Sequence, residues 1–345
     1  MPYSELAHGV WYPRGGMYQV VEALMSLARA AGVEFEFDAE VERIEVEGER
    51  AKGVLITDGR RMEADVVLAN ADLPYVYQNL LPPDGTAKRL MRKQYSCSVI
   101  SFFWGVDKVY ETLGPHTLFL ADDYRANFTS IIRDLDLPAN PSMYVHAPAR
   151  LDPSMAPPGQ DTLIAIVPTG HMRPDDSRDW GSVRDEARRH VLRRLKTVGI
   201  DDLEEHIKFE TAYTPPSWAR HYNLVKGSTH GLSHNLTQLA YFRPHNRHAR
   251  YHNLYFAGPA HIPAQGCRPR WFPGVWLRKG SWKNYAWNDE RVRISFFQDS
   301  VIKRPPHGGY VSHTFGIWHV CPAWGATRPS FQEHVNSPTI YVAET

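Results

Sequence analysis

Residues 231–258 read GLSHNLTQLAYFRPHNRHARYHNLYFAG and end in a short apolar run, Leu254 to Ala257, that stops at Gly258. A strand that ends at glycine brings backbone close to whatever lies beyond it, because no side chain intervenes. The polar segment ahead of the run, Arg243 to His248, contains a proline and predicts a turn. The stretch therefore predicts a buried strand whose end forms one edge of a ligand site.

A second buried strand is predicted at Val66 to Ala69, which is continuously apolar and runs into the small and polar residues Asn70 to Asp72. Alternating apolar and charged residues ahead of it, together with glycine turns, predict half-exposed strands. They lie at 33–37 and 41–46, and further strands are predicted at 51–56 and 61–63. A β-meander followed by a buried strand is typical of dinucleotide-binding domains.

A glycine pair, Gly15 and Gly16, precedes a helical pattern that ends at Gly32. The apolar positions of this pattern are Val20, Val21, Leu24, Leu27 and Ala28. Such a pair permits close approach of a ligand, and the first amides of a helix favour an anion. A simple tight turn is the alternative, and the pattern alone leaves both open.

The middle of the chain predicts a second sheet, because four β-rich runs are separated by turns and one helical region. These runs are 96–106, 116–120, 143–146 and 162–168. The aromatic residues Phe102, Phe103 and Trp104 either line a pocket or belong to the core. A basic amphipathic helix over 180–198 presents its arginines to solvent or, alternatively, to a membrane surface. The fold class predicted for the chain is α/β (α+β).

Composition excludes several classes of protein. With 345 residues and 43% hydrophobic content the chain is long enough for two domains, and a net charge of +1 argues against nucleic-acid binding. Three cysteines are too few for a disulfide framework, which suits the reducing cytoplasm. The first residues lack the features of a signal peptide, and no run reaches the roughly 18 apolar residues of a membrane span.

Common catalytic and metal motifs are also missing. His230 and His234 are four residues apart, but Gly231 argues against a helix there, so we expect no metal site. Gly231 to Asn235 lacks the second glycine of a nucleophile elbow, and the sequence contains neither a P-loop nor Gly-x-Gly-x-x-Gly. Arg243 and His245 are expected to belong to a structural turn, and no catalytic side chain is nominated.

Three blocks of the chain resemble the bacterial and fungal phytoene desaturases, flavoenzymes of the amine-oxidase-like superfamily. They are His8 to Tyr18, Asn70 to Tyr75 and Gly231 to Gly258. The resemblance covers residues 4 to about 258. It implies a partial FAD-binding, Rossmann-like domain at 1–89 that is rejoined by 231–258, and a mixed-sheet substrate domain at 90–230.

The resemblance implies an activity: a C–C single bond of phytoene or a related polyene becomes a double bond, as FAD accepts a hydride from one carbon and the other carbon loses a proton. A cytoplasmic enzyme with peripheral membrane contact is expected, because such a substrate resides in lipid. Cofactor contacts are implied at Gly15, Gly16, Val41 near the adenine, Asn70 and Gly258. A non-catalytic fragment unable to bind FAD and a flavin-dependent carotenoid isomerase are the alternatives.

The chain departs from the family at both ends. Family members open with a strand and a Gly-x-Gly-x-x-Gly loop, so Met1 is interpreted as a misplaced start. After Gly258 the family reads Ala-Ser-Thr-His-Pro-Gly-Thr-Gly-Val-Pro, whereas this chain does not. If the codons of residues 260–268 are read in a frame that starts at the third base of each codon, the genetic code permits Thr-His-Pro-Gly-Thr-Gly-Val-Pro. We therefore predict a frame slip or an unspliced intron, an irregular tail over 259–345, and an accidental match at Gly266.

Overall fold

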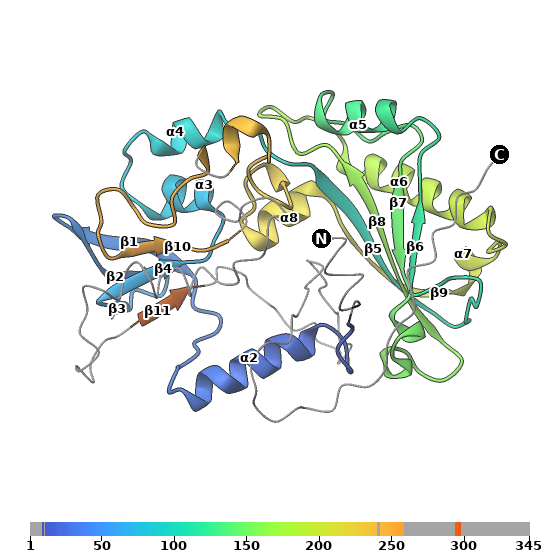
Figure 1. Cartoon of the computed structure of the whole chain (residues 1–345), viewed down its shortest axis with the longest axis horizontal. Coiled ribbons are helices and arrows are strands. Elements are labelled where there is room, and N and C mark those ends of the chain that lie inside the picture. Colours follow the sequence, from blue (N-terminus) through green and yellow to red (C-terminus); the bar gives the residue numbers. More distant parts are fainter. Residues whose placement is uncertain (1–8, 10, 240–241, 259–293, 298–345) are drawn as a thin grey trace.

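The structure, a computed structural model, describes residues 9, 11–239 and 242–258, together with the backbone of residues 294–297. Two hydrophobic cores divide the described residues into two lobes (Figure 1). We call residues 39–95 with 232–258 the meander lobe, and residues 98–222 the five-stranded lobe. The mixture of helices and sheets confirms the predicted α/β class.

Two small sheets form the meander lobe. The antiparallel sheet has the order β1 (Val41–Glu47), β2 (Arg50–Ile56), β3 (Arg61–Glu63). The parallel sheet has the order β10 (Leu254–Phe256), β4 (Val66–Ala69), β11 (Ile294–Phe297). Three short helices follow β4 and lie above the sheets in Figure 1, namely α3 (Leu73–Tyr75), the π-helix η1 (Val76–Leu80) and α4 (Thr86–Met91).

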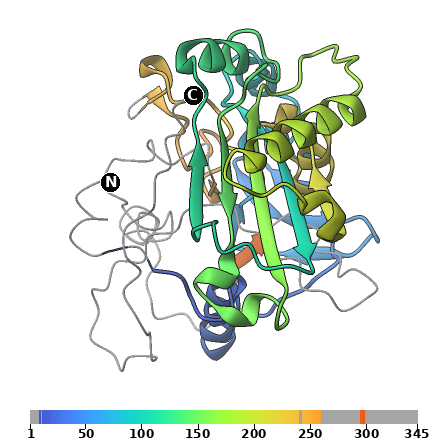
Figure 2. The same cartoon turned by 90° about the vertical axis from the view of Figure 1, so that its right-hand side faces the viewer.

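An antiparallel sheet forms the second lobe, in the order β6 (His116–Phe119), β7 (Met143–His146), β8 (Asp161–Thr169), β5 (Ser98–Val106), β9 (Ile207–Tyr213). Helix α6 (Trp180–Lys196) lies across one face of it (Figures 1 and 2). The remaining helices of this lobe are α5 (Tyr124–Ile132), η2 (Pro148–Arg150), η3 (Pro153–Met155), α7 (Leu203–His206) and α8 (Pro215–Tyr222). The four sheet runs and the basic helix are those that the sequence predicts.

The aromatic triplet of β5 is divided between the two faces of its sheet. Phe102 and Trp104 are fully buried in the core beneath α6, where Val191 and Leu195 also lie. Phe103 points to the opposite face, because successive residues of a strand alternate. All three side chains are buried, so of the two alternatives the structure favours the core; Phe103 is the member of the triplet on the face away from α6.

Two chain segments, at residues 95–97 and 228–232, run next to each other where they connect the lobes. Tyr95 forms a β-bridge with Leu232, and the Ser96 N–H donates to the Gly231 carbonyl at 2.9 Å. The Ser96 and Ser228 hydroxyls are 2.8 Å apart. The return segment also contains η4 (Val225–Gly227) and η5 (Leu236–Gln238). These contacts fix how the five-stranded lobe meets the meander lobe.

The N-terminal helix α2 (Tyr18–Ala30) confirms the predicted helical pattern, although none of its residues is buried. The strand predicted at 33–37 is wrong. That segment has no strand partner, and Phe35 and Phe37 stack on each other at 6.2 Å with partly exposed rings. Alternation alone does not make a strand where no neighbouring backbone is available for hydrogen bonds.

The tail predicted to be irregular contains one described element, β11, which pairs in parallel with β4. The remainder of 259–345, including Gly266, lies outside the described residues. Among the helices that the structure does describe, none is both long and apolar enough to pass through a bilayer.

Candidate cofactor and substrate site

The carboxyl ends of β4 and β10 meet at one edge. Phe256 pairs with Ala69 in a parallel register, so Asn70 and Gly258 follow two neighbouring strands. Gly258 has a φ of +126°, and a Cβ on it would lie 3.9 Å from the Ala71 carbonyl oxygen and 4.0 Å from Asn70 Oδ1. The predicted residues Asn70 and Gly258 therefore lie together, at the edge where open parallel sheets bind ligands.

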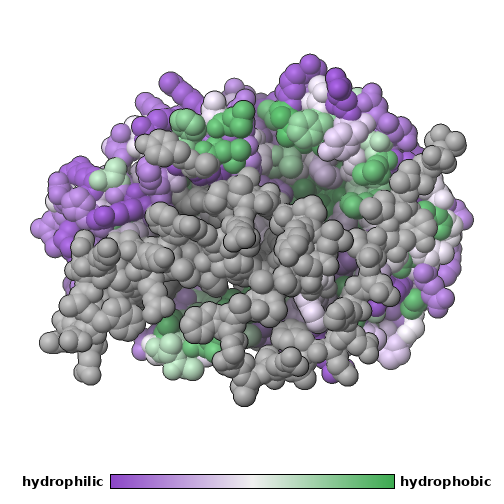
Figure 3. All heavy atoms as spheres, in the orientation of Figure 1, coloured by the Kyte–Doolittle hydropathy of each residue, from purple (hydrophilic) through white to green (hydrophobic). Residues whose placement is uncertain are grey.

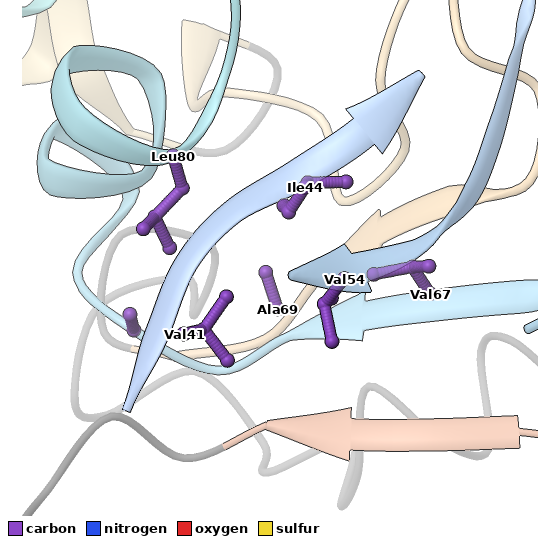
Figure 4. A pocket seen from close by; sticks show the side chains of 7 residues that line it. Val41, Ile44, Val54, Val67, Ala69 and Leu80 are labelled. Carbon is purple, nitrogen blue, oxygen red and sulfur yellow. The ribbon is translucent and has the colours of Figure 1, made fainter. Parts of the chain in front are cut away.

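Val41 lies at the same end of the lobe, in an apolar hollow between the antiparallel and parallel sheets (Figure 4). The lining side chains are Val41, Ile44, Val54, Val67, Ala69, Ala71 and Leu80. The free space in the hollow is about 10 Å³, roughly room for one water molecule. Ala71 belongs both to this hollow and to the surroundings of Gly258, so three of the five predicted positions converge.

Gly15 and Gly16 lie elsewhere, against η3 of the five-stranded lobe. The Gly15 N–H donates to Asp152 Oδ2 at 2.5 Å. Both glycines have positive φ, and a Cβ on Gly16 would approach the Met155 sulfur to 3.0 Å. The two glycines therefore join the segment before α2 to the five-stranded lobe, and the Gly15 N–H already has a carboxylate as its acceptor.

Asp152 is buried and receives three donors. Besides Gly15, the Ser154 N–H and hydroxyl donate to its Oδ1 at 3.0 and 2.8 Å. Burial works against ionisation of Asp152, but these hydrogen bonds outweigh it and lower the pKa of the carboxyl. Sequence reasoning missed Asp152, because nothing near it in the chain distinguishes it from a loop aspartate.

Asp72 is a second carboxylate that sequence reasoning missed as a site residue. It lies two residues after Asn70 and is 5% exposed. Its Oδ2 accepts the Val225 N–H at 3.0 Å, whereas no donor from the described residues reaches Oδ1. Burial raises the pKa of Asp72 to about 6, against the backbone hydrogen bonds from Val225 and Leu73. An unpaired buried oxygen is costly, and a ligand donor would offset that cost.

The sheet face opposite α6 carries an aromatic and imidazole cluster at its β6–β7 edge. His116 and His146 are register partners whose rings stack at 4.7 Å. The Tyr144 hydroxyl is 2.6 Å from His116 Nδ1, His146 Nδ1 donates to the Pro115 carbonyl at 2.7 Å, and the Tyr12 ring meets His146 edge-on.

Both imidazoles are neutral at pH 7. Burial lowers the pKa of His116 and lowers that of His146 to about 4. The Tyr144 hydroxyl and His116 are paired with each other, and buried His146 is paired with the Pro115 carbonyl, so the cluster forms a neutral aromatic layer on this face. The register continues this layer across the sheet through Ile164, Ile166 and Phe103.

In the turn before β10, the Arg243 side chain is held by hydrogen bonds to backbone carbonyls. Arg243 is buried and donates to the carbonyls of Leu232, Ser233 and Gln238. His245 on the same turn is exposed. In the part of the chain that the structure describes, no three His, Cys, Asp or Glu side chains are grouped as metal ligands.

Residues 1–266 match the family described as flavin containing amine oxidoreductase. The chain belongs to this family. Members of this family contain a flavin, and the match confirms the FAD cofactor that the sequence predicts. The family match covers the described residues of both lobes except β11.

Two curated relatives of this amine oxidoreductase are carotenoid enzymes by name. It is 39% identical over 287 residues to "Phytoene desaturase" of Fusarium fujikuroi, covering 77% of this chain and 50% of the relative. It is 41% identical over 268 residues to "zeta-carotene-forming phytoene desaturase" of Myxococcus xanthus, covering 77% and 51%. The chain thus spans about half the length of the curated relatives it matches.

A solved oxidoreductase from Methanosarcina mazei is similar with a TM-score of 0.48 and 17% identity, covering 72% of this chain and 50% of that one.

The edge formed by β4 and β10 fits part of a flavin cofactor. Gly258 leaves the backbone open to close approach, and the unpaired Asp72 Oδ1 suits a hydroxyl or N–H donor. Val41 lines an apolar hollow next to this edge that, at about 10 Å³, is too small for an aromatic ring. The Gly15 amide, by contrast, already has a carboxylate partner, so no phosphate contact is assigned to it.

Proposed function

We propose that this chain is part of an FAD-dependent oxidoreductase of carotenoid biosynthesis that desaturates C–C single bonds of phytoene or a related polyene. The observation that carries this proposal is the 39–41% identity to relatives named phytoene desaturase over 77% of the chain. We further propose that 1–89 with 231–258 forms the FAD-binding domain, and that 90–230 forms the substrate domain.

In this proposal the sheet face opposite α6 holds the polyene. Phe103, Ile164 and Ile166 provide an apolar wall, and the neutral imidazoles of His116 and His146 extend it toward Tyr12. A bound flavin supplies the hydride acceptor. The residues of the chain then orient a flat, uncharged substrate and exclude water from it.

Cofactor contacts are proposed at Val41, Asn70 and Gly258, which converge at the carboxyl edge of the parallel sheet. Asp72 is added as an acceptor for a cofactor hydroxyl or N–H group. Cofactor contacts at Gly15 and Gly16 stay a prediction, because the partners they have are Asp152 and Met155.

A second candidate is a fragment that does not retain FAD. Two observations favour it: the sequence contains no Gly-x-Gly-x-x-Gly, and the Gly15 amide is engaged by Asp152. A flavin-dependent carotenoid isomerase is a third candidate and differs from a desaturase only in leaving the number of double bonds unchanged.

One experiment separates the three candidates. The full chain is purified in the presence of FAD, its visible spectrum is recorded, and it is incubated with phytoene in vesicles and a quinone acceptor. A retained flavin with an increased number of conjugated double bonds supports the desaturase. A colourless protein supports the fragment, and a retained flavin with an unchanged double-bond count supports the isomerase.

We also propose that the protein contacts membranes peripherally, since a polyene substrate partitions into lipid. The apolar wall around Phe103 and Ile166 supports a hydrophobic substrate of this kind.

A further inference from the structure

The surface at α4 carries four cations without ion-pair partners. Lys88, Arg89 and Arg92 are exposed and Lys93 is half-buried, and none of them forms an ion pair with a described residue. The nearest carboxylate along the chain, Asp84, accepts the Thr86 N–H at 2.8 Å and keeps its negative charge. Because one carboxylate stands against four cations, the segment from Asp84 to Lys93 carries net positive charge.

Two exposed apolar side chains belong to the loop that is hydrogen-bonded to Gln94, the residue after Lys93. Leu236 is 85% exposed and Phe242 is 64% exposed, although large apolar side chains usually avoid water. Their loop is fixed to the end of the α4 segment through Gln94. The Gln94 carbonyl accepts the Gln238 side-chain N–H and the Ser233 N–H, both at 2.9 Å.

Figure 1 shows α4 next to this loop on the upper side of the molecule, and Figure 3 shows hydrophobic and hydrophilic surface side by side along that upper side. We name the surface made by Lys88, Arg89, Arg92, Lys93, Leu236 and Phe242 the α4 patch. It joins exposed apolar anchors to a cluster of unpaired cations within one small surface.

We propose that the α4 patch docks on an anionic lipid surface. Unpaired lysines and arginines are attracted to anionic headgroups, and exposed apolar side chains insert at the boundary between headgroups and acyl chains. The inference rests on the peripheral membrane contact proposed above and gives that contact a location. It does not depend on flavin binding or on desaturation.

Helix α6 provides an internal comparison, because it carries more arginines, of which Arg189 and Arg193 also form no ion pair with a described residue, but has no exposed apolar anchor. Arg184 pairs with Asp185, and Arg188 pairs with Glu204 and Glu210. No large apolar side chain of α6 is exposed. The charge of α6 is thus partly compensated and has no apolar anchor, so we expect it to remain solvated.

The test is co-sedimentation of the full chain with vesicles of phosphatidylcholine alone or mixed with phosphatidylglycerol. We expect binding to the anionic vesicles only, and weaker binding as salt screens the charges. The triple variant Lys88→Gln/Arg89→Gln/Arg92→Gln is expected to bind on the order of 100-fold more weakly. Leu236→Ser/Phe242→Ser is expected to bind roughly 10-fold more weakly.

Two matched controls accompany these variants. Arg184→Gln/Arg189→Gln/Arg193→Gln removes the same charge from α6, and Phe209→Ser removes an apolar side chain that is 60% exposed on β9. Neither control is expected to change vesicle binding. Circular dichroism of every variant checks that its fold is retained.

Three results would overturn the inference. They are equal binding to neutral and anionic vesicles, an equal loss of binding in the α6 control, and binding to a soluble polyanion without binding to vesicles. Because the assay contains neither FAD nor polyene, a failure of the proposed desaturation leaves this test unaffected.

Discussion

The Gly15 N–H donates to the Asp152 carboxylate at 2.5 Å and so joins the segment before α2 to the five-stranded lobe. The two residues are 137 positions apart in the chain. None of the residues of α2 is buried, so this hydrogen bond and the Gly16 contact with Met155 hold the start of the helix.

Removing the Asp152 carboxylate should destabilise the protein. Asp152→Ala leaves the Gly15 and Ser154 donors unpaired, and we expect a loss of about 1–3 kcal/mol in the free energy of unfolding. Urea unfolding at pH 7 measures it, with the exposed Asp175→Ala as the control. Because the pKa of Asp152 is lowered by folding, its stabilisation is present at neutral pH and is lost as pH falls through that lowered pKa. A difference between Asp152→Ala and wild type that persisted in acid would contradict this.

Asp72 should have the opposite dependence on pH. Burial raises its pKa to about 6, so the folded state binds the proton more tightly than the unfolded state. Its favourable contribution is complete below the unfolded pKa of about 3.9 and is lost as pH rises to about 6. Asp72→Asn keeps an acceptor for Val225 but does not ionise. We expect it to be about 2 kcal/mol more stable than wild type at pH 7.5 and similar near pH 4. Unfolding midpoints of both proteins at both pH values test this. Equal stability of Asp72→Asn and wild type at pH 7.5 would show that burial does not destabilise the ionised Asp72 carboxylate.

Variants of Trp104 and Phe103 in β5 should differ in their effect on stability, because the two side chains lie on opposite faces of the sheet. Trp104 is fully buried beneath α6 and donates its indole N–H to Glu210 at 2.7 Å. We expect Trp104→Ala to cost about 3–5 kcal/mol of unfolding free energy. Phe103→Leu keeps most of the apolar volume on the other face, so a smaller loss, under about 1.5 kcal/mol, is expected.

A polyene hydrocarbon titrated in detergent should distinguish the two positions further. Phe103→Leu is expected to weaken quenching of tryptophan fluorescence by the polyene, because this side chain belongs to the proposed substrate wall. Phe102→Leu is the matched control on the helix side. Equal weakening in both variants would argue that the loss reflects packing of the sheet instead.

Sequence periodicity predicted most of the strands and the two long helices, because each buries one face in a local pattern of period 2 or 3.6. The same patterns could not predict which residues meet across lobes. Gly15 and Gly16 have the composition of a ligand turn, but their partner Asp152 is remote in sequence. The sequence shows Asp72 as a polar residue after a strand, but it does not show that the Asp72 carboxylate accepts the N–H of the remote Val225. The strand expected at 33–37 failed because alternation does not specify a pairing partner.

Titration of the full chain with FAD, followed by flavin fluorescence, shows whether the carboxyl edge of β4 and β10 binds a flavin. We predict saturable binding by wild type and loss of binding by Gly258→Val, whose side chain would stand at a φ of +126° near Ala71. Gly59→Ala, at a φ of +91° in an open turn, imposes a related backbone strain away from the edge and should bind like wild type. Absence of FAD binding by the folded wild-type chain, or unchanged binding by Gly258→Val, would contradict the account.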